Sequence, residues 1–347
     1  MQRITFAERV AYLFYYPSES FIVYTSPPRG KNRLSVASQI TVKVDRVSKN
    51  FGEFTAVDEL SLTVRSGRIF GLLGPNGAGK TTTIRMIVNI TAPDSGTIDL
   101  FGRKIDPKLQ DRIGYLPEER GLYRRMKIAD QMRFFAELKN VSRNEINQRI
   151  DHWLERVELA EWKNKKAIEL SKGMQQKIQF ITAILHDPDL LILDEPFSGL
   201  DPVNVGLLKE IVLDLRRAGK TIIFSTHQME VAEEICDDIC LINRSKKVFE
   251  GDLREIRSSF GRNAVALRYE GGDGVLEDRS LVSKIQHSVD EAEVLLAEGA
   301  NAQTLLRRLI DSGATIGKFE MVEPSLNDIF IAKITENNEK VSGNRKA

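Results

Sequence analysis

The stretch GLLGPNGAGKTTTIR, from Gly71 to Arg85, contains the spacing G-x-x-x-x-G-K-T. The apolar run RIFGLLG, which overlaps its start, predicts a buried strand, and the following KTTTIRMIVNI has the periodicity of a helix. A strand, a glycine-rich loop and a helix in this order bring successive backbone N–H groups to a helix N-terminus, where they can bind phosphate oxygens. The sequence therefore predicts a phosphate site here.

Two side chains of this loop are candidates for direct chemistry. Lys80 can reach the outer phosphates of a nucleotide as a point charge, and the Thr81 hydroxyl can ligate Mg²⁺. The residues expected to contact the nucleotide are Gly74, Pro75, Asn76, Gly77, Ala78, Gly79, Lys80, Thr81 and Thr82. Taken alone, the loop leaves kinases, GTPases and other phosphate-loop enzymes open.

Two further apolar runs end in residues that can act on a phosphate. LLILDEP predicts a buried parallel strand with Asp194 and Glu195 at its carboxyl end, where ligands bind in such sheets. Asp194 suits a metal or its water ligands, and Glu195 suits polarising the attacking water. His227 ends the run TIIFSTH and can reach the same crevice as a γ-phosphate donor, with a structural histidine as the alternative.

Composition excludes several classes of protein. The 347 residues include 50 basic and 49 acidic side chains, so no excess of positive charge supports a nucleic-acid partner. No run of about 18 apolar residues predicts a membrane-spanning helix. Cys236 and Cys240, four positions apart, are expected on one helix face or at a helix-to-strand junction, as small buried residues rather than a disulfide or metal pair.

Periodicity and glycine positions predict the following organisation. Residues 1–38 are expected to be a poorly ordered extension, with a membrane-surface or partner-binding segment as the alternative. Residues 39–258 predict an α/β domain with a mostly parallel core sheet, an antiparallel β subdomain and a helical insertion at about 119–186. Residues 262–336 predict a small α+β domain with the order β, β, α, β, α, and residues 337–347 a polar tail.

Four motifs in a fixed order, GPNGAGKTT, LSKGMQQK, LILDEPFSGLD and STH, resemble those of the ATP-binding subunit of ABC transporters over about residues 40–255. The resemblance implies a P-loop cassette that binds ATP and Mg²⁺ and hydrolyses ATP in a dimer of two cassettes. It implies that Glu195 is the catalytic glutamate and His227 the switch histidine.

The resemblance also assigns residues outside the phosphate loop. It implies that Ser171 and Gly173 bind the γ-phosphate of ATP held by the opposite subunit and that Phe51 stacks on adenine. Asp201, in the segment SGLD, would belong to the loop that communicates across the dimer.

Two positions depart from the family pattern. The usual LSGGQ is LSKGM here, so Lys172 adds a charge beside the phosphate and Met174 removes an amide. Glu118 stands where the family generally has a glutamine that ligates Mg²⁺. Because a carboxylate also ligates a hard cation, we expect Glu118 to keep this role.

The segment ending in EPSLNDIF resembles an accessory domain of ABC exporters of sodium ions, drugs and antibiotics. This resemblance leaves a dimer-stabilising appendage and a regulatory sensor both open. It implies an exporter subunit that pairs with a second copy or a paralogous cassette and docks on a transmembrane permease at the cytoplasmic face of the membrane. The segment GLYRRMKIADQMRFF is where the family would place the permease contact.

Two other functions compete with this interpretation. A soluble ABC ATPase of translation or DNA repair generally carries two cassettes or a long coiled-coil insertion, whereas this sequence has one cassette and no sustained heptads. A degenerate module that holds ATP without turnover is disfavoured because Lys80, Glu195 and His227 are all present. We therefore expect ATP hydrolysis coupled to export.

Overall fold

The computed structural model describes residues 40–119, 121–259, 264–287, 291–297, 299–322, 325–331 and 333. The predicted extension 1–38 and tail 337–347 lie outside the described residues. The chain divides into two compact units, Met1–Glu250 and Gly251–Ala347. This division falls a few residues before the domain boundary that the sequence suggests.

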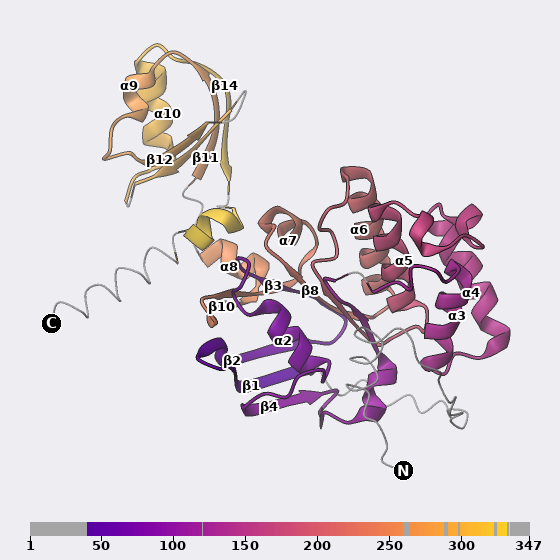
Figure 1. Ribbon diagram of the computed structural model, residues 1–347. Coiled ribbons are helices and arrows are strands. Elements are labelled where there is room, and N and C mark those ends of the chain that lie inside the picture. Colours follow the sequence, from indigo (N-terminus) through magenta and orange to yellow (C-terminus); the bar gives the residue numbers. More distant parts are fainter. Residues whose placement is uncertain are drawn as a thin grey trace. The chain divides into compact units, whose positions relative to one another are not determined.

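The first unit contains a six-stranded sheet in the order β10-β9-β3-β8-β7-β6. Strands β3, β8 and β10 of this sheet are labelled in Figure 1. The strands are β3 (Ile69–Leu73), β6 (Ile113–Leu116), β7 (Leu190–Asp194), β8 (Thr221–Thr226), β9 (Asp238–Asn243) and β10 (Lys246–Asp252). The pairs β6–β7, β7–β8, β8–β3 and β3–β9 are parallel. All residues of β3, β7 and β8 are buried, as expected for apolar strands covered on both faces.

An antiparallel sheet forms a second layer of this unit. Its strands are β1 (Ile40–Phe51), β2 (Phe54–Arg65), β4 (Ser95–Leu100) and β5 (Arg103–Lys104), in the order β2-β1-β4-β5. Alternate residues of β1 and β2, such as Val42, Val44, Leu60 and Leu62, enter one apolar cluster with helix α2 (Lys80–Ile87) and the core strands. This cluster fixes the phosphate loop between the two sheets.

Helices make up most of the chain between β6 and β7. They are α3 (Ile128–Leu138), α4 (Arg143–Arg156) and α5 (Lys172–Ile184), with short 3₁₀ turns at Ala160–Trp162 and Ala167–Glu169. Residues 121–127 are not helical, because their backbone pairs with residues 163–168: the N–H of Ile168 donates to the Arg124 carbonyl at 2.9 Å. No helix among the described residues is both long and apolar enough to span a membrane.

Two helices follow β7, and the cysteines lie beyond the second. These are α6 (Pro202–Arg217) and α7 (Met229–Ile235). Cys236 comes directly after α7 and Cys240 lies in β9, so the pair occupies a helix-to-strand junction, and both thiols are free. Burial raises the pKa of each thiol, as expected for structural rather than reactive cysteines.

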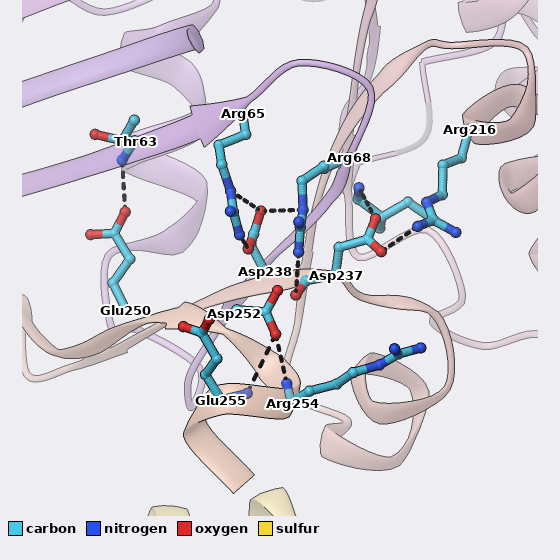
Figure 2. Close-up of polar contacts among 11 residues, drawn as sticks. Thr63, Arg65, Arg68, Arg216, Asp237, Asp238, Glu250, Asp252, Arg254 and Glu255 are labelled. Atoms are coloured by element: carbon cyan, nitrogen blue, oxygen red, sulfur yellow. Dashed lines mark hydrogen bonds and ion pairs between the residues drawn. The ribbon is translucent and has the colours of Figure 1, made fainter. Parts of the chain in front are cut away.

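Charged side chains form ion pairs and hydrogen bonds at the start of β9. Arg65 and Arg68 both contact the carboxylate of Asp238, with Arg68 Nε 2.8 Å from Oδ2 (Figure 2). The preceding Asp237 accepts a hydrogen bond from the N–H of Ile69 at 2.9 Å and an ion pair from Arg216 of α6. These contacts join β2, β3, β9 and α6 at the edge of the core sheet opposite to the phosphate loop.

The second unit has its own core. It contains α8 (Leu253–Ser259), β11 (Ala264–Glu270), α9 (Asp273–Leu276), β12 (Val282–His287), β13 (Ala292–Leu296), α10 (Ala302–Asp311) and β14 (Thr315–Val322), with a further helical segment at 326–331. The Asp252 carboxylate accepts the N–H of Arg254 at the start of α8 (Figure 2).

Four strands of this unit form an antiparallel sheet in the order β12-β13-β11-β14. Val265, Leu267 and Val294 of the sheet pack against Leu305 and Leu309 of α10. The predicted order β, β, α, β, α omitted β12, whose residues VSKIQH alternate too weakly between polar and apolar to reveal a strand.

Candidate nucleotide site

The phosphate loop joins β3 to α2 in a backbone conformation that requires glycine. Gly74 has a φ of 150° and Gly79 a φ of 109°. A Cβ at Gly74 would lie 2.1 Å from the Ile242 carbonyl oxygen, and one at Gly79 would lie 2.4 Å from that of Ala56. The loop therefore packs directly against β9 and β2, and only glycine permits this approach.

Lys80, the first residue of α2, is buried within the loop. Its Nζ donates to the carbonyl oxygens of Gly74 at 2.8 Å and Pro75 at 3.2 Å. The same Nζ lies 3.5 Å from Oε1 of Glu195. This ammonium group is therefore positioned between the phosphate loop and the acid that follows β7.

Asp194 ends β7 and lies close to both Thr81 and Glu118. Thr81 Oγ1 lies 3.3 Å from Oδ1 of Asp194 and 3.4 Å from Oε2 of Glu118. The other oxygen of Asp194, Oδ2, is buried and has no hydrogen-bond partner among the described residues. Burial raises the pKa of Asp194, while hydrogen bonds from Ser225 and Thr81 act in the opposite direction.

Glu195 and His227 face each other across the ends of β7 and β8. His227 Nδ1 lies 3.0 Å from Oε1 of Glu195. Since an ionised carboxylate can only accept, Nδ1 carries the proton of this hydrogen bond. Glu195 is 7 % exposed and has a φ of 48°, a left-handed conformation that is uncommon for a residue with a side chain.

Sheet order explains why motifs far apart in sequence meet here. The strands β3, β8, β7 and β6 are consecutive neighbours and run parallel, so all four end at one edge. Lys80 follows β3, His227 follows β8, Glu195 follows β7 and Glu118 follows β6. This edge is where ligands bind in open α/β sheets.

Three residues that the sequence assigned to nucleotide binding lie elsewhere. Ser171 caps α5, its Oγ accepting the N–H of Met174 at 3.2 Å, and Asp201 caps α6 through the N–H of Asn204 at 3.0 Å. These hydrogen bonds from Asn204 hold the pKa of Asp201 below its usual value. Within the described residues, no hydrogen bond or ion pair joins Ser171, Gly173 or Asp201 to Lys80.

Phe51 lies at the end of the β1–β2 hairpin. Its side chain is 54 % exposed, and Lys49 Nζ lies 5.7 Å from the ring centroid. The hairpin continues into Ala56, whose carbonyl oxygen packs against Gly79. An exposed aromatic ring is thus available on the same strand pair that contacts the phosphate loop.

Sequence reasoning missed three polar side chains that position the site. The Ser225 hydroxyl contacts the carboxylate of Asp194 and the backbone N–H of Glu195. From α5, Gln176 Nε2 donates to the Pro196 carbonyl at 3.2 Å and Gln179 Nε2 to the Glu119 carbonyl at 3.4 Å. The available signal was the run of amides in QQKIQ on a helix whose other residues are largely apolar, since buried amides need partners.

Comparisons with known proteins agree with this geometry. A family model described as "ABC transporter" matches residues 57–198, and one described as "ATP-binding protein DrrA1-3-like, C-terminal domain" matches residues 251–334. A solved structure titled "Structure of ATP binding subunit of ABC transporter" is 30 % identical, with a TM-score of 0.60, and the match covers 64 % of this chain and 93 % of that one.

Curated relatives extend the similarity over most of the chain. The uncharacterized ABC transporter ATP-binding protein YhaQ of Bacillus subtilis is 46 % identical over 84 % of this chain and 97 % of its own length. Nod factor export ATP-binding protein I of Ralstonia nicotianae is 33 % identical over 89 % of this chain and 97 % of its own length. The chain therefore belongs to the ATP-binding proteins of ABC transporters, and its first unit is an ABC-type ATPase cassette.

Proposed function

We propose that this chain pairs with a second copy or a paralogous cassette, hydrolyses ATP at the shared interface, and energises export through a separate transmembrane permease at the cytoplasmic face of the membrane. The observation that carries the proposal is the approach of Lys80 and His227 to one carboxylate oxygen of Glu195, at 3.5 Å and 3.0 Å. A base flanked by two cationic or donor groups suits water attack on a γ-phosphate.

The roles divide between the residues that end the four strands. Lys80 and the loop N–H groups bind the phosphates, and Glu195 orients and deprotonates the attacking water. His227 binds Glu195 through Nδ1–H, so its Nε2 can donate to a phosphate oxygen only when the imidazole carries a second proton. The backbone contacts of Gly74 and Gly79 keep these groups in a fixed arrangement.

The donor set at Thr81, Asp194 and Glu118 fits Mg²⁺. Their atoms are all oxygens, which this hard cation prefers, and the buried Oδ2 of Asp194 lacks another partner among the described residues. The described residues hold no cluster of three or more His, Cys, Asp or Glu side chains suited to a metal. Mg²⁺ commonly keeps several waters and is bound by one or two carboxylates together with substrate phosphates. Mg²⁺ would neutralise charge on the phosphates.

Ser171 and Gly173 are proposed to act on the nucleotide of the opposite subunit, Asp201 to belong to the loop that communicates across the dimer, and Phe51 to stack on the adenine of its own subunit. The first three of these lie on α5 and at the start of α6, without a contact to Lys80 in the described chain. Gly173 packs toward Leu200 of the SGLD loop, because a Cβ there would lie 3.5 Å from Leu200 Cδ2. The closeness of these two segments supports a shared surface for a partner cassette.

Export is supported by the names of several relatives. Several similar proteins are named for Nod factor export, and the C-terminal match is to a domain of an ATP-binding protein. The permease contact is proposed at the paired segments 121–127 and 163–168. There Met126 is 36 % and Ile168 52 % exposed. Tyr123, in the first of these segments, stacks on Phe135 with ring centroids 6.1 Å apart.

Replacing Glu195 by Gln tests the hydrolytic part of this proposal. We expect turnover of the purified protein to fall by about 10²–10⁴-fold, because an amide cannot accept the proton of the attacking water. ATP binding should persist, since the phosphate loop is unchanged. The control is Glu210→Gln on the exposed surface of α6. Unchanged turnover in Glu195→Gln would remove Glu195 from the catalytic role.

A further inference from the structure

Ser225 lies in β8 opposite Asp194, the last residue of β7, and contacts both Asp194 and the backbone of Glu195. It is fully buried, and the strand register pairs it with Asp194. Its Oγ donates to Asp194 Oδ1 at 2.5 Å and accepts the backbone N–H of Glu195 at 3.0 Å. A serine hydroxyl has one hydrogen and two lone pairs, so it can make both hydrogen bonds at once.

The hydrogen bond to the Glu195 backbone stabilises an unfavourable conformation. The φ of 48° at Glu195 lies in the left-handed region, which is unfavourable for a residue with a Cβ. The N–H of such a buried residue must also find an acceptor. Ser225 supplies that acceptor, and the resulting backbone turn directs the Glu195 side chain toward Lys80 and His227.

The hydrogen bond to Asp194 determines which of its oxygens remains available. Oδ1 receives the hydroxyls of Ser225 and Thr81, whereas Oδ2 has no hydrogen-bond partner among the described residues. Without Ser225, Oδ1 would keep only the longer contact with Thr81, at 3.3 Å, and the carboxylate could rotate about its terminal torsion, which is broad and two-fold. The hydroxyl therefore presents Oδ2 in a single orientation.

We propose that Ser225 is a positioning residue whose single hydroxyl orients two acids: Asp194, a proposed Mg²⁺ ligand, and Glu195, the proposed catalytic base. The inference rests on the Mg²⁺ site proposed above. It predicts that removing the hydroxyl weakens two functions together: the contribution of Mg²⁺ to ATP affinity, and turnover at saturating Mg²⁺ and ATP. Binding of ATP in the absence of metal depends on the phosphate loop and should not change.

The experiment compares the full chain with Ser225→Ala, Ser225→Thr and Thr221→Val. Thr221 is a matched control because it is a buried hydroxyl at the other end of β8, and it also accepts a backbone N–H, from Gly67 at 3.0 Å. ATP affinity is measured by titration calorimetry with Mg²⁺ and with EDTA, and kcat and KM are measured separately.

We expect Ser225→Ala to lose about 10–100-fold in kcat and in the Mg²⁺-dependent gain in affinity, as is typical when a group that orients a metal ligand is removed. Affinity in EDTA should match the unchanged chain, and Ser225→Thr should restore both quantities. The inference is overturned if Ser225→Ala and Thr221→Val have the same kcat and the same Mg²⁺-dependent gain in ATP affinity. It is also overturned if Ser225→Ala loses as much ATP affinity in EDTA as it does with Mg²⁺. If the unchanged chain itself shows no Mg²⁺ dependence, the proposed metal site is wrong instead.

Discussion

At the scale of single residues, Glu118 gives the site one more negative charge than the amide that the family generally has there. Its Oε2 lies 3.4 Å from Thr81 Oγ1, and its side chain is exposed. In water, an exposed charge pair about 4 Å apart contributes only roughly 1 kcal/mol. The extra charge is therefore expected to strengthen cation binding modestly and to be unnecessary for chemistry.

We predict that Glu118→Gln retains ATPase turnover at saturating Mg²⁺, because the amide oxygen still ligates the cation. The Mg²⁺ concentration for half-maximal activity should rise by about fivefold, which corresponds to the loss of roughly 1 kcal/mol. A titration of activity against Mg²⁺ measures this shift. Glu119→Gln, next to it and also exposed, is the control. Near-complete loss of turnover in Glu118→Gln would show that the acid is specifically required.

The sequence identified the residues that end each strand but not the ones that orient them. Lys80, Glu195 and His227 belong to motifs whose letters specify them, and the structure brings these three together. Ser225 acts only through its register opposite Asp194, and register between strands 30 positions apart is not visible in one sequence. The assigned roles of Phe51, Ser171, Gly173 and Asp201 remain predictions.

At the scale of elements, α5 ties the helical insertion to the core sheet. Its amides at Gln176 and Gln179 donate to the carbonyls that follow β7 and β6. Just beyond its last turn, His186 Nε2 lies 3.1 Å from the Ile113 carbonyl. Burial, reinforced by the charge of Lys139, lowers the pKa of His186 to about 3, so this ring is neutral in the folded protein.

This pKa predicts a loss of stability in mild acid. In the unfolded chain His186 has an ordinary pKa of 6.5 and binds a proton below it, whereas the folded chain does not. The stabilisation is thus complete above pH 6.5 and is lost as the pH falls toward 3. The variant His186→Gln keeps a donor for the Ile113 carbonyl but has no group that titrates in this range. We predict that between pH 7.5 and 5.5 its free energy of unfolding falls by about 1 kcal/mol less than that of the wild-type chain.

Urea unfolding at the two pH values measures the difference. His152→Gln, an exposed histidine of α4, is the control and should follow the unchanged chain. Equal pH dependence in His186→Gln and the unchanged chain would contradict the assignment of His186 as a buried neutral ring.

Element type was easier to predict from sequence than element pairing. The apolar runs of β3, β7 and β8 and the periodicity of α3, α4 and α10 are strong local signals. The non-helical pairing of residues 121–127 with 163–168 depends on backbone hydrogen bonds across about 40 positions. Composition does not encode such contacts, so the sequence predicted a mostly helical stretch there.

At the scale of the whole molecule, the transport function depends on a partner, and the exposed apolar residues of the insertion are its proposed contact. Tyr123 packs on Phe134 and Phe135, and burial raises its pKa. A charge at Tyr123 would therefore disturb the fold as well as the contact. Met126 and Ile168 are exposed on the paired segments and make cleaner probes.

We predict that Met126→Asp and Ile168→Asp uncouple hydrolysis from export. A charge placed in an apolar contact makes the free energy of binding less favourable by about 2 kcal/mol, so the affinity for the permease should fall by roughly thirtyfold. Basal ATPase activity of the isolated chain should not change. Co-purification with the permease and transport in vesicles measure the effect. The control is Leu138→Asp, at the exposed end of α3. Normal transport by Met126→Asp and Ile168→Asp would show that these residues do not contact the permease.

The strand order also determines when the core sheet can form during synthesis on the ribosome. Within the core sheet, β3 lies between β8 and β9, and Ile69 pairs with Ile222, about 150 positions further along the chain. At a synthesis rate of about 5–20 residues per second, the phosphate loop waits on the order of ten seconds for its neighbouring strands. The nucleotide site is incomplete during that interval, because Glu195 and His227 have not yet been made. The exposed apolar strand β3 is therefore expected to need chaperones until β8 emerges.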